Sequence, residues 1–351
     1  MKIIHDGDAA FDDVTALCLL LCSKNVSVEA ITVSNTGEAH GLNGAENMAK
    51  VCFLLGIPEI PIAYGSEESC DSSGKPFPEY IRTEADNLFL GIELPKHPNP
   101  NITNSAVDLL VKTLEDSNER IAILATGPLT NIAELIKKYP QLAKEKIEKI
   151  VIMGGAVHIE GNIKALDTKS NNTVAEWNIY ADPKAADIVF SSTIPITLVP
   201  LDATNQVPMT KEFFDSLIHK QQPALKLIYQ MLKKLIDDLS METFLQQFCL
   251  WDPLAAMICI DPQIAITERM LLAVDLETAQ TKHVSGNEKN SSTIDVAIKI
   301  PDADLILRKL IDQIIDYSLH ARPNIADTNF FRKSVKERVF MRDDGLQNLY
   351  N

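Results

Sequence analysis

The sequence predicts an α/β fold: a single doubly wound, mostly parallel sheet with flanking helices and an appended C-terminal strand pair and helices. Short apolar runs typical of buried strands alternate with longer helical patterns along the first 205 residues. Connections that can carry a helix join parallel neighbours and place helices on both faces of a sheet. The 351 residues suffice for one large domain with a substantial core.

The expected elements follow one another in a regular order. The first strand covers residues 2–5, and the apolar face of the first helix covers residues 14–21. Further strands are expected at residues 28–34, 60–63, 121–125, 150–153 and 196–200. Helical patterns between them cover residues 40–55, 106–114, 128–138 and 183–190. The appended part comprises a helix at 225–239, strands at 270–276 and 293–300 around a Gly-Asn turn, and a closing helix at 302–319.

Two segments depart from this alternation. Residues 67–102 are rich in Pro, Ser, Asn and Gly, and a segment of that length inside a domain is typical of a lid, a binding loop or an excursion. We expect one domain over residues 1–320. Residues 321–351 form a C-terminal extension of unknown role, and the sequence leaves open whether it packs on the body, packs on another subunit or stays mobile.

Composition excludes several classes of function. A net charge of -15 argues against nucleic-acid binding, which depends on clustered Lys and Arg. The six cysteines form no CxxC pair, which favours reduced core residues over zinc or disulfide scaffolds. The sequence shows neither a leader pattern nor a membrane-spanning stretch, so we expect a cytoplasmic protein with no membrane partner.

The first strand and the first helix are joined by an acidic cluster made of Asp6, Asp8, Asp12 and Asp13. Asp6 and Asp8 are two apart and face the same way on a strand, while Asp12 and Asp13 open the helix, where its dipole favours anions. Two carboxylates about 6 Å apart repel by roughly 3 kcal/mol at an effective dielectric near 20. Either some of them are protonated or a hard cation such as calcium or magnesium lies among them. An acidic helix start without a ligand is the alternative.

Polar motifs later in the chain gather at the same edge of the predicted sheet, because several of them directly follow an apolar strand. They occupy residues 33–35, 125–131, 153–156, 161–162, 175–183 and 250–253. With the acidic cluster, this ordered set resembles the nucleoside hydrolase family, whose members are calcium-dependent enzymes that cut the N-glycosidic bond of ribonucleosides. The resemblance covers residues 2–317. It implies release of ribose and free base from a small-molecule nucleoside, and assembly as a homodimer or homotetramer.

The resemblance also implies roles for individual residues. The Ca2+ ligands would be Asp8, Asp13, the backbone carbonyl of Thr126, and Asp252. Asp8 would also be the general base for the attacking water, with Asp6 as a supporting residue. Ribose contacts would come from Asp12, Asn35, Asn162, Glu176, Asn178 and, as a ribose-side wall, Trp177. This equipment suits an oxocarbenium-like transition state, which nearby negative charge stabilises.

Trp251 stands where some relatives have a histidine that acts as general acid. The purine-preferring branch is similar in having Trp there, where stacking favours protonation of the leaving base, so the resemblance implies purine ribonucleosides. Two positions depart from the family: Ala9-Ala10 replaces the usual Pro-Gly, and Phe77, Tyr80 or Ile81 stands near a second stacking Trp of the purine branch.

Two other functions remain open from the sequence. A nucleoside-binding or sensing protein would keep the same metal site and lose turnover through the change at Ala9-Ala10. A magnesium-dependent phosphotransferase would use Asp6 as its nucleophile, but that class has no use for residues 176–178. The seven histidines share no metal-ligand spacing, so each is expected in the core or on the surface.

Overall fold

The computed structural model describes residues 1–284 and 292–318. In this part of the chain ten strands form one sheet in the order β4-β3-β2-β1-β5-β6-β7-β10-β8-β9. The strands are β1 (Lys2–Gly7), β2 (Ser27–Val33), β3 (Ile62–Tyr64), β4 (Ile102–Thr103), β5 (Ile121–Ala125), β6 (Ile147–Met153), β7 (Ile196–Val199), β8 (Ile266–Val274), β9 (Thr281–His283) and β10 (Ser292–Lys299). Strands β1 to β7 and β10 pair in parallel, and β8 is antiparallel to β10 and β9.

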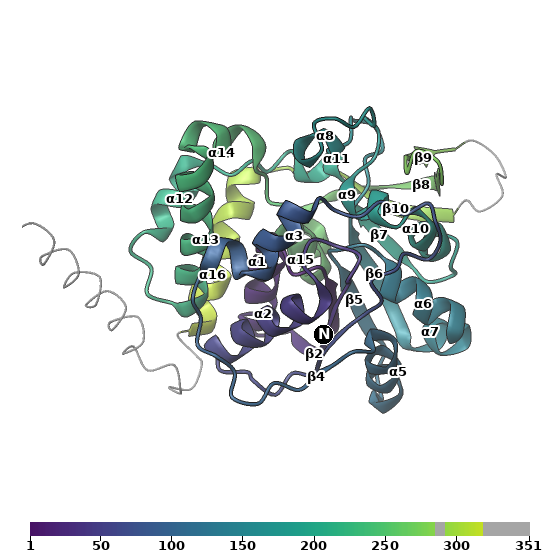
Figure 1. The fold of residues 1–351 in the computed structure, drawn as a ribbon, viewed down its shortest axis with the longest axis horizontal. Helices are drawn as coiled ribbons and strands as arrows, with labels where there is room; N and C mark the ends of the chain where they lie inside the picture. Colours follow the sequence, from purple (N-terminus) through teal and green to yellow (C-terminus); the bar gives the residue numbers. More distant parts are fainter. Residues whose placement is uncertain (285–291, 319–351) are drawn as a thin grey trace, which may run out of the picture.

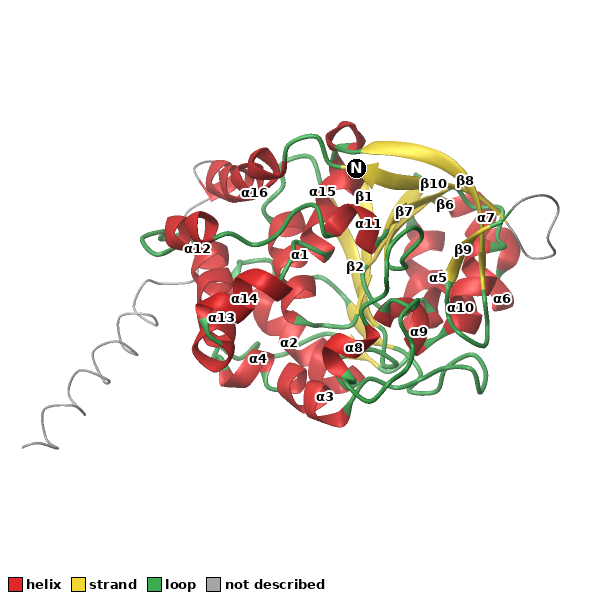
Figure 2. Ribbon diagram, turned by 90° about the horizontal axis from the view of Figure 1, so that it is seen from above, coloured by secondary structure: helices red, strands yellow, loops and turns green. Residues whose placement is uncertain are grey.

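Helices cover both faces of this sheet, which lies between two helical layers (Figure 1, Figure 2). The first layer contains α1 (Phe11–Leu21), α2 (Gly41–Leu54), α12 (Lys211–Leu217), α13 (Pro223–Leu239), α14 (Met241–Gln247), α15 (Asp252–Ile260) and α16 (Ala303–Ser318). The second contains α5 (Ala106–Asp116), α6 (Thr130–Lys138), α7 (Pro140–Lys146), α9 (Trp177–Ala181) and α10 (Pro183–Phe190). The remaining helices are α3 (Glu79–Asp86), α4 (Leu88–Gly91), α8 (Ile163–Leu166), α11 (Leu201–Thr204) and the 3-10 turn η1 (Pro262–Ile264).

The two layers enclose separate hydrophobic cores because side chains alternate across the central strands. Ile3 and Leu124 belong to the core under α1, whereas Ile4 and Ile123 belong to the core under α6. Helix α1 is apolar almost all round and is buried from Val14 to Leu21. It therefore lies inside the first layer, where it packs against α15, and its N-terminus is fixed at the carboxyl edge of the sheet.

The predicted fold class is confirmed, with one refinement. The C-terminal strand pair continues the main sheet, because β10 pairs in parallel with β7 and β8 then pairs with β10. Strand β8 begins at Ile266, four residues before the predicted start, and the predicted Gly-Asn turn lies outside the described residues. The very short strands β4 and β9 have no clear sequence pattern and were not predicted.

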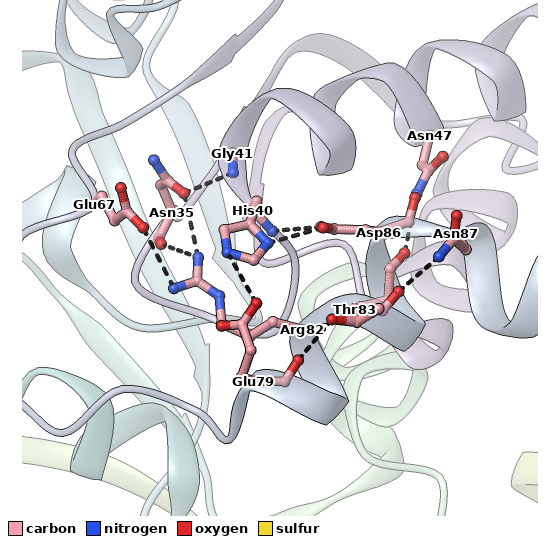
Figure 3. A network of polar contacts seen from close by, with 11 residues as sticks. Asn35, His40, Gly41, Asn47, Glu67, Glu79, Arg82, Thr83, Asp86 and Asn87 are labelled. Atoms are coloured by element: carbon pink, nitrogen blue, oxygen red, sulfur yellow. Dashed lines mark hydrogen bonds and ion pairs between the residues drawn. The ribbon is translucent and has the colours of Figure 1, made fainter.

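The segment 67–102 contains helices α3 and α4 and leads into β4. Helix α3 docks on the N-terminal half of α2 (Figure 3): both Asp86 oxygens bond to His40, one to its backbone N–H and one to its ring, each at 2.8 Å. Asn47 Nδ2 donates to the carbonyls of Ala85 and Asp86 at 3.0 Å. Tyr80 also donates to the Leu166 carbonyl at 2.8 Å. The segment is therefore an ordered excursion attached beside the carboxyl edge.

The six cysteines are all free, and four of them are buried, as expected for reduced core residues. The closing helix α16 matches its predicted range up to Ser318, and the predicted extension 321–351 lies outside the described residues. None of the helices described is both long and apolar enough to cross a bilayer.

Candidate active site

The acidic loop after β1 is held between the two neighbouring strands. The Ser34 N–H donates to the Gly7 carbonyl at 2.7 Å, and the Thr126 N–H donates to the Asp6 carbonyl at 2.8 Å. A side chain at Gly37 or Gly127 would overlap Asp8, so both glycines allow close approach of their loops. These contacts place Asp8 at the centre of the carboxyl edge.

The turn at Ala9 is strained. Ala9 has φ of 64°, a left-handed conformation that glycine normally adopts, and its methyl group packs against Gly44. Ala10 is extended and precedes α1 as its N-cap residue. Ala9-Ala10 therefore forms a tight turn between Asp8 and α1 in place of the usual Pro-Gly, and the conformation of Ala9 stores backbone strain beside the acidic cluster.

Asp6 is engaged by the protein itself. Its Oδ1 accepts hydrogen bonds from Thr32 Oγ1 at 2.5 Å and from Asn131 Nδ2 at 2.8 Å. Its Oδ2 is buried without a partner among the described residues, and burial raises the pKa of Asp6 to about 7. A fully buried carboxyl that already accepts bonds from Thr32 and Asn131 is poorly placed to attack a phosphate, which argues against the phosphotransferase alternative.

Three carboxyl groups form a cluster that suits a cation. Asp12, Asp13 and Asp252 each place one oxygen within 4.8 Å of the other two. Asp12 and Asp13 lie in the first turn of α1, and Asp252 begins α15, which packs against α1. Burial raises the pKa of Asp13 and Asp252 well above the ordinary range and that of Asp12 to about 7, and neighbouring carboxylates add to each shift.

Asp8 lies beside this cluster. The Asp8 carboxyl is close enough to those of Asp12 and Asp13 for its charge to raise the pKa of both. Buried carboxylates this close together repel one another, so the cluster needs either protons or a cation to offset their charge. A divalent cation supplies the same compensating charge, and an all-carboxylate set suits a hard ion.

This grouping differs in part from the roles that the resemblance implies. Asp13 and Asp252 belong to the cluster of three carboxyls and also to the ligand set that the resemblance implies. Asp12, assigned to ribose, contributes the third oxygen of the cluster, and it is the half-buried member of the three. Asp8, assigned as a ligand and base, is not one of these three, but its charge raises the pKa of each of them.

A polar chain that the sequence analysis missed supports Asp13 from behind. Thr126 Oγ1 lies 2.5 Å from Asp13 Oδ1 and 2.8 Å from His5 Nε2. Because the hydroxyl gives its one proton to Asp13, His5 Nε2 must be the donor to Thr126. Burial lowers the pKa of His5 to about 4, so the ring is neutral. His5 is a core residue, as expected, but its bond to the site depends on a strand pairing that its spacing does not reveal.

Glu176 and Asn178 come together at the start of α9. Glu176 caps this helix, accepting from the N–H groups of Asn178 at 2.9 Å and Gly155 at 2.8 Å. Asn178 Nδ2 donates to the carbonyls of Thr126 and Met153 at 3.2 Å. Burial raises the pKa of Glu176 to about 7. Asn178 thus contacts the carbonyl that the resemblance assigns to the metal.

Asn162 and Trp177 meet at the same helix. Asn162 is half-buried, and its Oδ1 accepts from the backbone N–H of Trp177 at 3.1 Å. Asn162 therefore positions the start of α9. The buried Trp177 ring stacks on Phe77, with centroids 4.7 Å apart and planes at 28°. Of the three residues considered in place of a second stacking Trp, Phe77 therefore lies against Trp177 and covers one face of it.

Trp251 belongs to an aromatic group at the start of α15. Its ring lies edge-on to Phe11, with centroids 6.3 Å apart, and 5.7 Å from Phe248. The residue is half-buried, and its Nε1 has no partner among the described residues. Trp251 therefore provides, next to Asp252, an indole whose N–H can still donate a hydrogen bond.

Asn35 and Arg82 complete the edge (Figure 3). Arg82, on α3, bonds to Asn35, and its charge lowers the pKa of Asp8 against the upward effect of burial. The sequence analysis did not select Arg82, because a single arginine in an irregular segment carries no motif signal.

Comparison with known proteins identifies the lineage of this site. The sequence model described as inosine-uridine preferring nucleoside hydrolase matches residues 3–306. The chain belongs to this family. Its members are ribonucleoside hydrolases, so the expectation of an N-ribosyl hydrolase is confirmed at the level of the family.

Individual relatives of this nucleoside hydrolase differ in their substrates. The pyrimidine-specific ribonucleoside hydrolase RihA of Citrobacter koseri is 35% identical over 237 residues, which are 66% of this chain and 70% of the relative. RihA of Salmonella agona is 38% identical over 211 residues, 59% of this chain and 62% of the relative. The structure of a purine-preferring ribonucleoside hydrolase from Gardnerella vaginalis superposes with a TM-score of 0.78 and 29% identity, covering 92% of this chain and all of that one.

Proposed function

We propose that this chain hydrolyses the N-glycosidic bond of ribonucleosides, with a preference for purines, at a calcium site in the acidic cluster. The observation that supports this most directly is the convergence of Asp12, Asp13 and Asp252 within 4.8 Å. Two of these residues come from the first turn of α1 and the third from the distant α15. An acidic helix start alone does not explain why a third buried carboxyl is brought to the same point.

The residues present fit a calcium ion. Asp8, Asp13, Asp252 and the Thr126 carbonyl would hold it, and all four offer oxygen atoms, which calcium prefers. Asp12 is the half-buried member of the cluster and would contact the ribose hydroxyls. A bound calcium ion would offset the carboxylate charge and lower the pKa of water nearby.

Asp8 then acts as the general base. It takes a proton from the attacking water, whose oxygen forms the new bond to the ribose C1′. The C–N bond breaks with its electron pair moving to the departing purine, which takes up a proton from solvent at a ring nitrogen, and Asp8 later returns its own proton to solvent. Positive charge develops on the sugar, and the carboxylates of Asp8 and Asp12 stabilise it electrostatically.

The finer substrate preference rests on Trp251. Its half-buried indole lies at the first turn of α15, beside Asp252, and stacking against a bicyclic purine is more extensive than against a pyrimidine. The purine-preferring Gardnerella relative covers nearly the whole chain, which also supports this preference. The pyrimidine-specific RihA relatives make uridine and cytidine the essential competitors to test.

The test is a panel of inosine, adenosine, guanosine, uridine and cytidine, with release of reducing sugar measured with and without chelator. We expect ribose from all three purines at higher kcat/KM than from either pyrimidine, and loss of activity in chelator. Faster cleavage of uridine would overturn the purine preference. Nucleoside binding without ribose release would favour the sensing alternative. Light scattering on the same sample tests assembly as a homodimer or homotetramer, which the family resemblance supports.

A further inference from the structure

Arg82 extends from α3 to a residue at the carboxyl edge (Figure 3). Its Nη2 donates to the Asn35 carbonyl at 2.9 Å and approaches Asn35 Oδ1 at 3.4 Å, and its Nη1 lies 3.8 Å from Glu67 Oε1. Arg82 is only 5% exposed. A buried guanidinium is unfavourable without hydrogen-bond partners, so this side chain depends on Asn35 as much as it constrains it.

The contacts around Asn35 fix the orientation of its amide. Oδ1 accepts from the Gly41 N–H at 2.6 Å, which identifies this atom as the oxygen because a backbone N–H can only donate. Nδ2 donates to the Gly65 carbonyl at 3.3 Å, and its second N–H has no acceptor among the described residues. A side chain at Gly41 would overlap Asn35, so the amide is also confined sterically.

We propose that Arg82 is a positioning residue for nucleoside binding, which holds the Asn35 amide with one N–H free for a ribose hydroxyl. The inference rests on the proposed function, in which Asn35 contacts ribose. In this role Arg82 connects segment 67–102 to the substrate site without touching the substrate itself. Other hydrogen bonds dock α3 on α2, between Asp86 and His40 and between Asn47 and Ala85. Loss of the bonds from Arg82 to Asn35 therefore leaves α3 attached.

The experiment is a double-mutant cycle. Arg82→Met and Arg82→Lys are made in the wild type and in Asn35→Ala, and Arg269→Met, an exposed arginine paired with Asp295, is the matched control. We expect Arg82→Met to raise the KM for inosine roughly tenfold, the effect of losing one charge-assisted hydrogen bond, with kcat changed less than about threefold. Lysine can donate one of the two bonds, so Arg82→Lys should recover part of the loss. In the Asn35→Ala background neither change should raise KM further.

The outcomes separate this inference from the proposed function. An equal rise in KM with and without Asn35 would overturn the positioning role, as would an unchanged KM in a folded Arg82→Met protein. If Arg82→Met does not fold, the cycle with Arg82→Lys decides by the same criterion. If the wild type binds inosine without releasing ribose, only the proposed hydrolysis fails, and the cycle is read from Kd by calorimetry. Absence of binding to every nucleoside of the panel overturns both.

Discussion

The Thr126 hydroxyl donates a 2.5 Å hydrogen bond to Asp13 Oδ1, linking the end of β5 to the first turn of α1 across 113 positions of sequence. His5 Nε2 donates to the same hydroxyl from β1 at 2.8 Å. One threonine therefore links the adjacent strands β1 and β5 to the first turn of α1, which carries Asp12 and Asp13. Such outer contacts orient the side chains that would bind a metal.

Thr126→Val keeps the backbone carbonyl and the shape of the side chain but removes the hydroxyl. Asp13 Oδ1 then loses its donor, while Oδ2 keeps the Ala10 N–H, and His5 loses its acceptor, each loss at a cost of about 1–3 kcal/mol. We expect calcium affinity to fall roughly 10- to 100-fold by titration calorimetry. Thr32→Val, which removes a bond to Asp6, is the matched control. Unchanged calcium affinity in folded Thr126→Val would contradict this role.

Asp8→Ala removes the proposed base and a proposed ligand together. We expect ribose release to fall by roughly 10³-fold or more. Asp8→Asn keeps the size of the side chain but cannot accept the proton, so its kcat should fall to a similar extent while the protein stays folded. Activity of Asp8→Ala within about tenfold of wild type would reject the assignment.

Trp251→Ala tests stacking on the leaving base. We expect kcat/KM for inosine to fall much more than that for p-nitrophenyl riboside, whose leaving group needs no protonation. Phe248→Ala, which removes a ring 5.7 Å from Trp251, controls for general loss of packing in the aromatic group. Equal losses on both substrates would refute the stacking role.

Removal of divalent ions tests the identity of the cation. Chelator should abolish ribose release, and calcium should restore it better than magnesium, because the cluster offers several carboxylates without imposed octahedral geometry. Calcium at about 100 times its Kd should also stabilise the fold by roughly 2.7 kcal/mol. Full activity in chelator, or restoration by magnesium alone, would show that calcium is not the cofactor.

The metal-free protein should lose stability as pH rises. Burial raises the pKa of Asp6 from 3.8 to about 7, so between these values the folded state holds a proton that the unfolded state has lost. The free energy of unfolding therefore decreases as pH rises through this window. Asp6→Asn keeps an oxygen to accept from Thr32 and Asn131 and should reduce the slope by the contribution of one carboxyl in urea titrations at pH 4 to 8, whereas the exposed control Asp304→Asn should not. An unchanged slope in Asp6→Asn would exclude Asp6 as the source.

Much of the sheet and the acidic cluster could be predicted from the sequence. Buried parallel strands are apolar runs of characteristic length, so β1, β5 and β6 were located by pattern alone. The carboxyl ends of parallel strands share one edge, which brought the segments 6–13 and 125–131 together in the prediction. The strand pair β8 and β10 was found, but a local pattern does not show which edge strand it joins.

What the sequence alone determined was the α/β class, the acidic loop and its family, because these depend on residue type and short-range periodicity. The family resemblance had already grouped Asp252 with Asp13, but only the tertiary structure placed His5 behind Thr126 and directed Arg82 to Asn35. Each of these pairs is distant in the chain or lies in an irregular segment. Their contacts depend on how helices dock and strands pair, and spacing along the chain does not encode that geometry.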